Sequence, residues 1–197
     1  MASLSHAQAA RIIGDAWRRV HGRAPTLAER VYAQAIAYLE TGYGRAGQFG
    51  PLSDRGYFNW GALQTRQPAG GVCPAGTVPG NDQGSVCFYA YRSDDAAAEA
   101  FIRTLTTRHW PVIAAMRSSP EAVARAMRVP PVYYAGTTGT EEDRIARYAT
   151  AIRNAIRNIG ERVPAGAAAS FLPWLALAGA GYAAYRWLGP PAPRRRE

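Results

Sequence analysis

One acidic side chain of this sequence lies where a carboxyl group could act as a proton donor. Glu40 stands in the stretch Y-L-E-T-G-Y-G, where an apolar helical pattern runs into glycines and a tyrosine. The C-terminal end of a helix carries partial negative charge, which disfavours an ionised carboxylate. Nearby aromatic residues that could close over it and exclude water are Tyr38, Tyr43, Phe58 and Trp60. Both effects raise the pKa of a carboxyl group, and a protonated carboxyl is the form that a general acid needs. The alternative is an ordinary glutamate on a solvated helix face.

Two later segments add to this pattern. F-N-W-G-A-L-Q runs from Phe58 to Gln64, and V-Y-Y-A-G runs from Val132 to Gly136. Taken in order, E-T-G-Y-G, N-W-G-A-L-Q and Y-Y-A-G resemble the three signatures of the lysozyme-like superfamily. The resemblance is to lytic transglycosylases and goose-type lysozymes, with a similarity also to flagellar-type glucosaminidases. It spans about Leu27 to Ile159, and it implies a lysozyme-like fold.

The resemblance also implies an activity, the cleavage of peptidoglycan at the β-1,4 bond between N-acetylmuramic acid and N-acetylglucosamine. Glu40 would be the general acid, and Tyr133 would lie by the scissile bond and orient it. Residues that would bind the glycan are Tyr43, Asn59, Trp60, Gly61, Gln64 and Tyr134. The chain departs from the family pattern in two places, because Ala62-Leu63 replaces Leu-Met and Tyr134 replaces Asn. The tyrosine pair leaves open which ring acts, or whether both belong to the core.

A second carboxylate would decide the mechanism. Retaining glycosidases place two carboxyl groups about 5 Å apart, and inverting enzymes place them several Å further apart to admit water. Asp54 is the candidate for a second catalytic carboxylate, with Asp82 as the other loop candidate, although S-D-R-G and G-N-D-Q-G are equally typical of turns. If neither reaches the site, Glu40 would act first as acid and then as base. That one-carboxylate route of the lytic transglycosylases is the favoured interpretation.

No metal or cofactor is expected. The three histidines are far apart in the sequence, and Cys73 and Cys87 lack the spacing of a metal site. The two cysteines bracket a loop rich in Gly and Pro, and a disulfide there would contribute roughly 3 kcal/mol. We expect this bridge rather than two free thiols, which favours an oxidising compartment.

The sequence predicts a mainly helical α+β domain with a small loop and hairpin lobe. Capping boxes at Ser5 and Thr26 open two helices, which end at Gly22 and in the Gly42–Gly44 region. The chain from Gly47 to Gly84 reads as loop, and V-C-F-Y-A-Y reads as a strand after a turn. Three later helices are predicted, after the capping residue Ser93, from Pro120, and after Thr140, the last with an isoleucine-rich stripe.

The bulk composition leaves two other functions open. The chain has 197 residues, 48% of them hydrophobic, and a net charge of +9 carried entirely by arginine. A basic surface attracts polyanions, but the arginines are dispersed apart from Arg194 to Arg196, so nucleic-acid binding is not expected. The other alternative is a protein of the same fold that binds peptidoglycan without cleaving it.

The carboxyl-terminal part differs in composition from the rest. We expect a catalytic domain at 1–162, a membrane segment at 163–188 and a basic tail at 189–197, because 163–185 contains no charged residue. A buried or disordered Ala/Gly tail is the alternative. The amino end has no signal-peptide pattern. The expected location is the bacterial envelope, on the periplasmic side of the membrane, or a phage particle that carries the enzyme to the wall.

Overall fold

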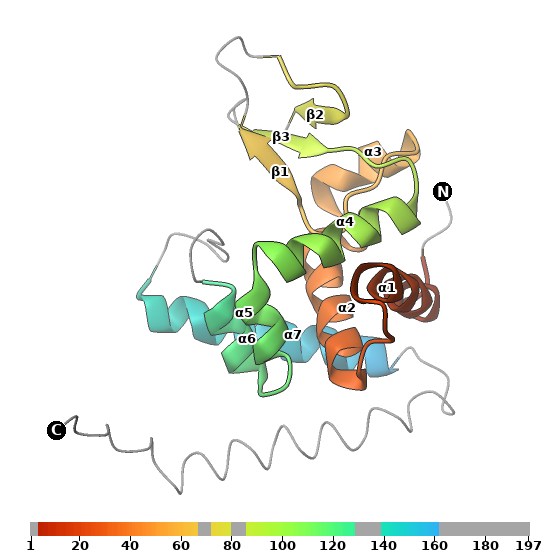
Figure 1. Cartoon of the computed structure of the whole chain (residues 1–197). Coiled ribbons are helices and arrows are strands. Elements are labelled where there is room, and N and C mark those ends of the chain that lie inside the picture. Colours follow the sequence, from red (N-terminus) through yellow and green to blue (C-terminus); the bar gives the residue numbers. More distant parts are fainter. Residues whose placement is uncertain (1–3, 67–71, 80–85, 129–138, 162–197) are drawn as a thin grey trace, which may run out of the picture.

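The protein is mainly helical, with one small antiparallel sheet at one end (Figure 1). The computed structural model describes residues 4–66, 72–79, 86–128 and 139–161. The helices are α1 (His6–His21), α2 (Leu27–Thr41), the 3₁₀ turn η1 (Gly47–Phe49), α3 (Gly50–Asp54), α4 (Asp94–Thr107), α5 (Trp110–Ala115), α6 (Pro120–Ala126) and α7 (Glu141–Glu161). The strands are β1 (Gln64–Arg66), β2 (Thr77–Pro79) and β3 (Val86–Tyr89).

The long helices begin where the capping residues predict. Ser5 and Thr26 each form a capping box. In each, the hydroxyl accepts a hydrogen bond from the backbone N–H of the residue three positions later, and the side chain of that residue accepts one from the backbone N–H of Ser5 or Thr26. Ser93 caps α4 through the backbone N–H of Ala96, and Thr140 exchanges hydrogen bonds with Asp143 in the first turn of α7. These contacts satisfy N–H groups that have no partner inside a helix, so the predicted starts are confirmed.

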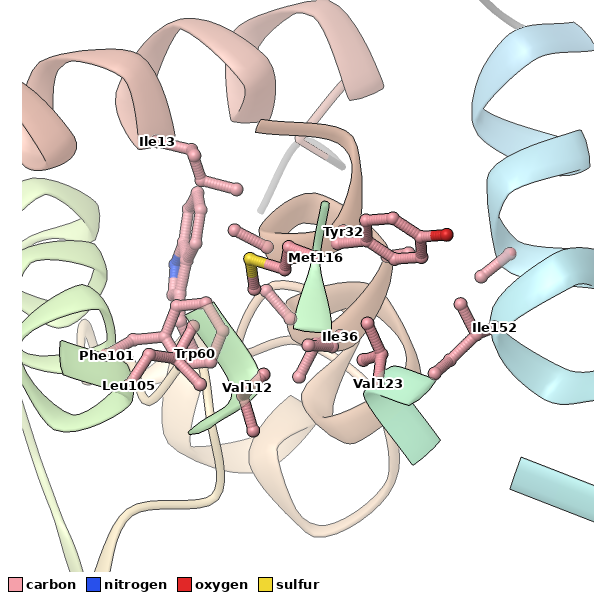
Figure 2. Packing of buried hydrophobic residues seen from close by; sticks show 14 of the residues in the cluster. Ile13, Tyr32, Ile36, Trp60, Phe101, Leu105, Val112, Met116, Val123 and Ile152 are labelled. Carbon is pink, nitrogen blue, oxygen red and sulfur yellow. The ribbon is translucent and has the colours of Figure 1, made fainter. Parts of the chain in front are cut away.

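Helix α2 runs through the middle of the helical body (Figure 1) and packs against α1 and α7. Helix α1 also packs on α4, and α6 packs on α7. In Figure 2, Trp60, Phe101 and Leu105 gather on one side of the core and Ile152 lies on the other, with Ile36 of α2 between them. The side chains of these five residues are at most 2% exposed, so α2 is the scaffold on which the other layers are assembled.

The sheet corrects part of the sequence interpretation. The central strand β3 pairs with β2, as a hairpin requires, and also with β1, in the order β1-β3-β2. The predicted loop from Gly47 to Gly84 therefore contains two strands and the short helix α3. Cys73 and Cys87 form the expected disulfide, with an S–S distance of 2.08 Å, which fastens the loop before β2 to the buried centre of the sheet.

Among the described residues, no helix has both the length and the apolar character needed to cross a bilayer. The predicted membrane segment at 163–188 lies outside the described residues, as does the tail at 189–197.

Candidate active site

The end of α2 is held by its own sequence. Thr41 Oγ1 donates to the carbonyl oxygen of Ala37 and accepts from the backbone N–H of Gly44 at 2.8 Å, and Gly42 takes a left-handed conformation with φ of 55°. Gly44 needs to be glycine, since a Cβ there would lie 2.9 Å from the backbone nitrogen of Asn59. The chain thus turns sharply after Glu40 and packs against the segment that leads into the sheet.

Glu40 lines a small pocket of about 40 Å³. The pocket lies between α2, the segment before β1, α4, the turn between α4 and α5, and the C-terminal end of α6. Its lining residues are Ile36, Glu40, Gly61, Leu63, Phe101, Thr104, Leu105, His109 and Met127. Most of this wall is apolar, so a carboxyl group facing it has lost much of its contact with water.

Burial raises the pKa of Glu40 to about 8, and the hydrogen bond from Tyr148 opposes this rise. Tyr148 Oη donates to Glu40 Oε1 at 2.6 Å, across from α7 to α2. Burial and the neighbouring Glu40 raise the pKa of Tyr148 itself, so the phenol stays a donor. A carboxyl group with this pKa is largely protonated at neutral pH and retains a fixed orientation, which are the two properties of a general acid.

The predicted direction of the Glu40 shift is confirmed, and burial is its main cause. Tyr38, Tyr43, Phe58 and Trp60 are not among the residues that line the pocket. The apolar wall comes instead from α2, α4, the chain before β1 and the end of α6. Helix α4, which packs on α1, supplies Phe101 and Leu105 to this wall.

Three residues expected to bind glycan belong to the core. Tyr43 is 2% exposed and bonds to His6 Nδ1 at 2.8 Å. Asn59 is 1% exposed, and its Nδ2 donates to the carbonyl oxygens of Leu63 and Tyr89. The prediction that these residues bind glycan was wrong because polar and aromatic residues among glycines are typical of an exposed loop.

Trp60 is the third of these residues. It is fully buried and its Nε1 donates to Asp94 Oδ1 at 2.9 Å. The same carboxylate holds Arg45 in a two-pronged pair, with distances of 2.8 and 2.7 Å. Through Asp94, Trp60 and Arg45 connect the segment before β1 and the turn after α2 to the first turn of α4. Trp60 thus helps to position the pocket wall, although it does not line the pocket itself.

The other predicted site residues are placed as follows. Gly61 lines the pocket, and a Cβ there would lie 2.4 Å from the Phe101 ring, so glycine lets the wall close. Gln64 is exposed on β1 and Asp54 is exposed at the end of α3, and neither lines the pocket. Tyr133, Tyr134 and Asp82 lie outside the described residues.

Two residues with a strained backbone lie close in sequence to residues that line the pocket. Among the described residues other than glycine, those with positive φ are Tyr43 at 59° and Ala62 at 50°. Tyr43 lies in the turn after Glu40, and Ala62 lies between the lining residues Gly61 and Leu63. A left-handed residue with a side chain costs of order 1 kcal/mol and is enriched at functional sites.

Two residues near Glu40 were missed from the sequence: Tyr148, which bonds Glu40, and His109, which lines the same pocket. Tyr148 was interpreted only as one member of the apolar stripe of α7. A tyrosine in an otherwise aliphatic stripe indicates that its buried hydroxyl has a hydrogen-bond partner. His109 read as an isolated histidine far from the others. His109 lines the same pocket as Glu40 through the tertiary packing of the chain after α4, which no local pattern shows.

Comparison of the chain with protein-family models, with curated proteins and with solved structures gave no match.

Proposed function

We propose that the protein cleaves the glycan strand of bacterial peptidoglycan, with Glu40 as the general acid, on a lysozyme-like fold. The observation that carries the proposal is the protonated, oriented carboxyl group of Glu40 in an apolar pocket, with a pKa of about 8. The helical body with a small sheet at one end, and the three signatures in the order found in the sequence, support the same assignment.

The pocket favours the route with one carboxylate. Among the described residues, Glu40 is the one acidic side chain of the lining, and Asp54 is exposed away from it. Glu40 would give its proton to the glycosidic oxygen while the bond from that oxygen to C1 of the muramyl residue breaks. The departing sugar leaves with a free 4-hydroxyl group, and Glu40 is left as a carboxylate.

The same carboxylate would complete the reaction. It takes the proton of the muramyl 6-hydroxyl as O6 forms a bond to C1, which closes a 1,6-anhydro ring and restores the protonated Glu40. Tyr148 donates to Oε1 in both stages. Its bond strengthens when Glu40 is ionised, because a carboxylate is the stronger acceptor. This requires no second carboxylate and no activated water.

The distribution of arginines supports a wall substrate over nucleic acid. Within the described residues, many guanidinium groups are already paired with carboxylates. Such pairs include Arg19–Glu99, Arg23–Glu29, Arg45–Asp94, Arg128–Glu141 and Arg153–Glu121. A paired guanidinium offers less charge to a phosphate backbone, and phosphate contacts dominate nucleic-acid affinity.

The test is mass spectrometry of purified peptidoglycan after digestion with the full chain, beside Glu40→Gln and the surface control Glu99→Gln. We expect fragments ending in 1,6-anhydromuramic acid from the wild type and the control, and none from Glu40→Gln. Reducing-end fragments would mean hydrolysis and would require Asp54→Asn as the next variant. If the wild type bound the wall without releasing fragments, the protein would be a binding module rather than an enzyme.

Peptidoglycan lies outside the cytoplasmic membrane, so the proposed site of action is the bacterial envelope, reached from the periplasmic side or delivered by a phage particle. Fractionation of producing cells and of any released particles tests this, and recovery from the cytosol alone would contradict it.

A further inference from the structure

Two exposed arginines lie against one tyrosine ring outside the Glu40 pocket. Arg92 Cζ is 4.1 Å from the centroid of the Tyr57 ring, and Arg55 Cζ is 5.9 Å from the same centroid. Within the described residues, neither guanidinium group bonds a carboxylate, and Asp54, which precedes Arg55, forms no ion pair with it. Arg55 and Arg92, referred to below as the arginine pair, therefore present two positive charges at one place on the surface.

The backbone brings the arginine pair to the Tyr57 ring. Phe58 and Tyr91 exchange two backbone hydrogen bonds, of 2.8 and 3.0 Å, in an antiparallel bridge. Tyr57 and Arg92 are the next opposed residues, and because side chains alternate along a strand they lie on the face opposite to the buried Phe58. Arg55 reaches the same ring through the tight turn that follows α3, which lies beside the chain that leaves β3 (Figure 1).

A third arginine of this region shows the contrast with a structural ion pair. Arg45 Cζ lies 4.8 Å from the centroid of the Phe58 ring, and both carboxylate oxygens of Asp94 accept hydrogen bonds from its guanidinium group. Its side chain is only 18% exposed. The arginine pair has the ring contact without the carboxylate. Because like charges repel, an anion that binds both guanidinium groups would stabilise their arrangement.

The chemistry of the arginine pair favours a carboxylate as that anion. A guanidinium group presents its N–H donors in a planar fork that matches the two oxygens of a carboxylate. Contact with an aromatic face restricts the orientation of the fork and leaves its N–H groups free to bind. In peptidoglycan, carboxylates of this kind belong to the short peptide stems that are attached to the muramyl residues.

The arginine pair and the Glu40 pocket lie along the same two segments of the chain, 57–63 and 89–92. The N–H of Tyr89 donates to the carbonyl oxygen of Leu63 at 3.0 Å, and Leu63 lines the pocket. The bridge between Phe58 and Tyr91 lies between this bond and the arginine pair. A glycan strand bound at the pocket projects its stems over the surrounding surface, to which the arginine pair belongs.

We propose that Arg55 and Arg92, held against the Tyr57 ring, bind a carboxylate of a peptide stem, so that the protein prefers glycan strands that carry stems. The proposal rests on the function proposed above. It adds a contact outside the pocket, made by residues that the three sequence signatures do not contain.

The experiment measures binding without cleavage. The full chain carrying Glu40→Gln is titrated by calorimetry with soluble glycan strands released by an endopeptidase, which retain their stems. The comparison ligand is the same strands after their carboxyl groups have been converted to amides. Adding Arg55→Gln and Arg92→Gln together should weaken binding of the unmodified strands about fivefold, since each exposed ion pair contributes a factor of a few, and should change binding of the amidated strands by less than about twofold.

Two sets of variants serve as controls. Arg11→Gln with Arg157→Gln removes the same charge from exposed arginines of α1 and α7, and it should leave the preference for unmodified strands in place. Tyr57→Phe retains the ring and should bind as the parent does, whereas Tyr57→Leu should lose part of the preference. Because both members of the arginine pair are exposed, the urea midpoint of the double variant should match that of the parent.

A third ligand identifies the source of the carboxylate. Strands treated with an amidase lose their stems and retain only the lactyl carboxylate of each muramyl residue. The double variant and the parent should bind these strands equally. An equal loss of affinity for amidase-treated and untreated strands would overturn the assignment to the stems. An oligonucleotide whose binding depended on the arginine pair more strongly than that of the strands would show a phosphate site instead, and would also overturn it.

The outcomes separate this proposal from the proposed function. Cleavage by the wild type, together with an unchanged preference in the double variant, would overturn the role of the arginine pair and leave the function standing. A wild-type chain that neither binds nor cleaves the strands would overturn both.

Discussion

Replacing Glu40 by glutamine should stabilise the protein at neutral pH. Glutamine has the same shape and can still accept the hydrogen bond from Tyr148, but it never ionises. Glu40 has a pKa of about 8 in the folded protein and an ordinary value of 4.5 when exposed, chiefly because burial penalises the charged form. The folded state therefore binds its proton more tightly than the unfolded state does. This contribution to stability is complete below pH 4.5 and is lost as the pH rises toward 8.

The size of the effect follows from linkage. Each pH unit between the two pKa values removes about 1.36 kcal/mol of stability. At pH 7, about 2.5 units above the unfolded value, the loss is about 3 kcal/mol, and it levels off at roughly 5 kcal/mol above pH 8. The Glu40→Gln chain has no such dependence. The difference in unfolding free energy between variant and wild type should grow from near zero at pH 4 to about 3 kcal/mol at pH 7.

Urea denaturation at pH 4, 5.5, 7 and 8.5 measures this difference directly. Glu99→Gln is the matched control, because hydrogen bonds from Arg103 and Arg19 lower the pKa of Glu99. Its contribution has the opposite sign, present above the unfolded pKa and lost as the pH falls. The Glu99→Gln variant should thus be slightly less stable than wild type at pH 7.

A difference between Glu40→Gln and wild type that does not change with pH would refute the reasoning. So would a variant that is less stable than wild type at pH 7. Either result would mean that Glu40 is solvated and ionised in the folded protein, and the argument for a general acid would fail with it.

Three further predictions test neighbouring features. Tyr148→Phe removes a hydrogen bond that favours the ionised form of Glu40, so the pKa of Glu40 should rise further, and a ¹³C NMR titration of the carboxyl group measures this. The same substitution should lower the free energy of unfolding by about 1 kcal/mol. Glu29 is fully buried with a pKa of about 2, lowered mainly by Arg23, so its contribution is lost as the pH falls from 4.5 toward 2. Glu29→Gln should therefore lower the free energy of unfolding by about 2 kcal/mol at pH 7, a value reduced because Arg23 is exposed, and by little at pH 2. Equal losses of unfolding free energy at both pH values would contradict the pairing. Replacing Cys73 and Cys87 by serine should lower the unfolding free energy by about 3 kcal/mol in urea, and an unchanged midpoint would show that the bridge adds nothing.

The long helices could be predicted from sequence because their signals are local. A capping box lies within four residues, as at Thr26, and an apolar stripe repeats over several turns, as in α7. The elements that were missed are short. Strand β1 has three residues and α5 has six, too few to show a period, and β1 exists because β3 lies beside it. These short elements are determined by contacts between distant parts of the chain, which local sequence patterns do not show.

The site could be predicted in part, for the same reason. Glu40 and Gly61 stand in recognisable segments of the chain, and both line the pocket. Tyr148 is 108 residues away from its partner Glu40, and His109 lines the pocket from the turn between α4 and α5. Trp60 was misjudged because its environment is decided by Asp94, in the first turn of a different helix.

The turn after Glu40 explains why a carboxyl group ends this helix. The hydroxyl of Thr41 and the left-handed Gly42 satisfy the last turn of α2, so Glu40 is not needed for capping. A leucine or glutamine at this position would fill the apolar wall without the loss of about 3 kcal/mol that ionisation imposes at pH 7. The strained backbone at Tyr43 and Ala62 adds a further cost beside the same pocket. Marginally stable domains accumulate such costs where activity requires them, and the concentration of three of them around one carboxyl group is the strongest physical argument that Glu40 acts on a substrate.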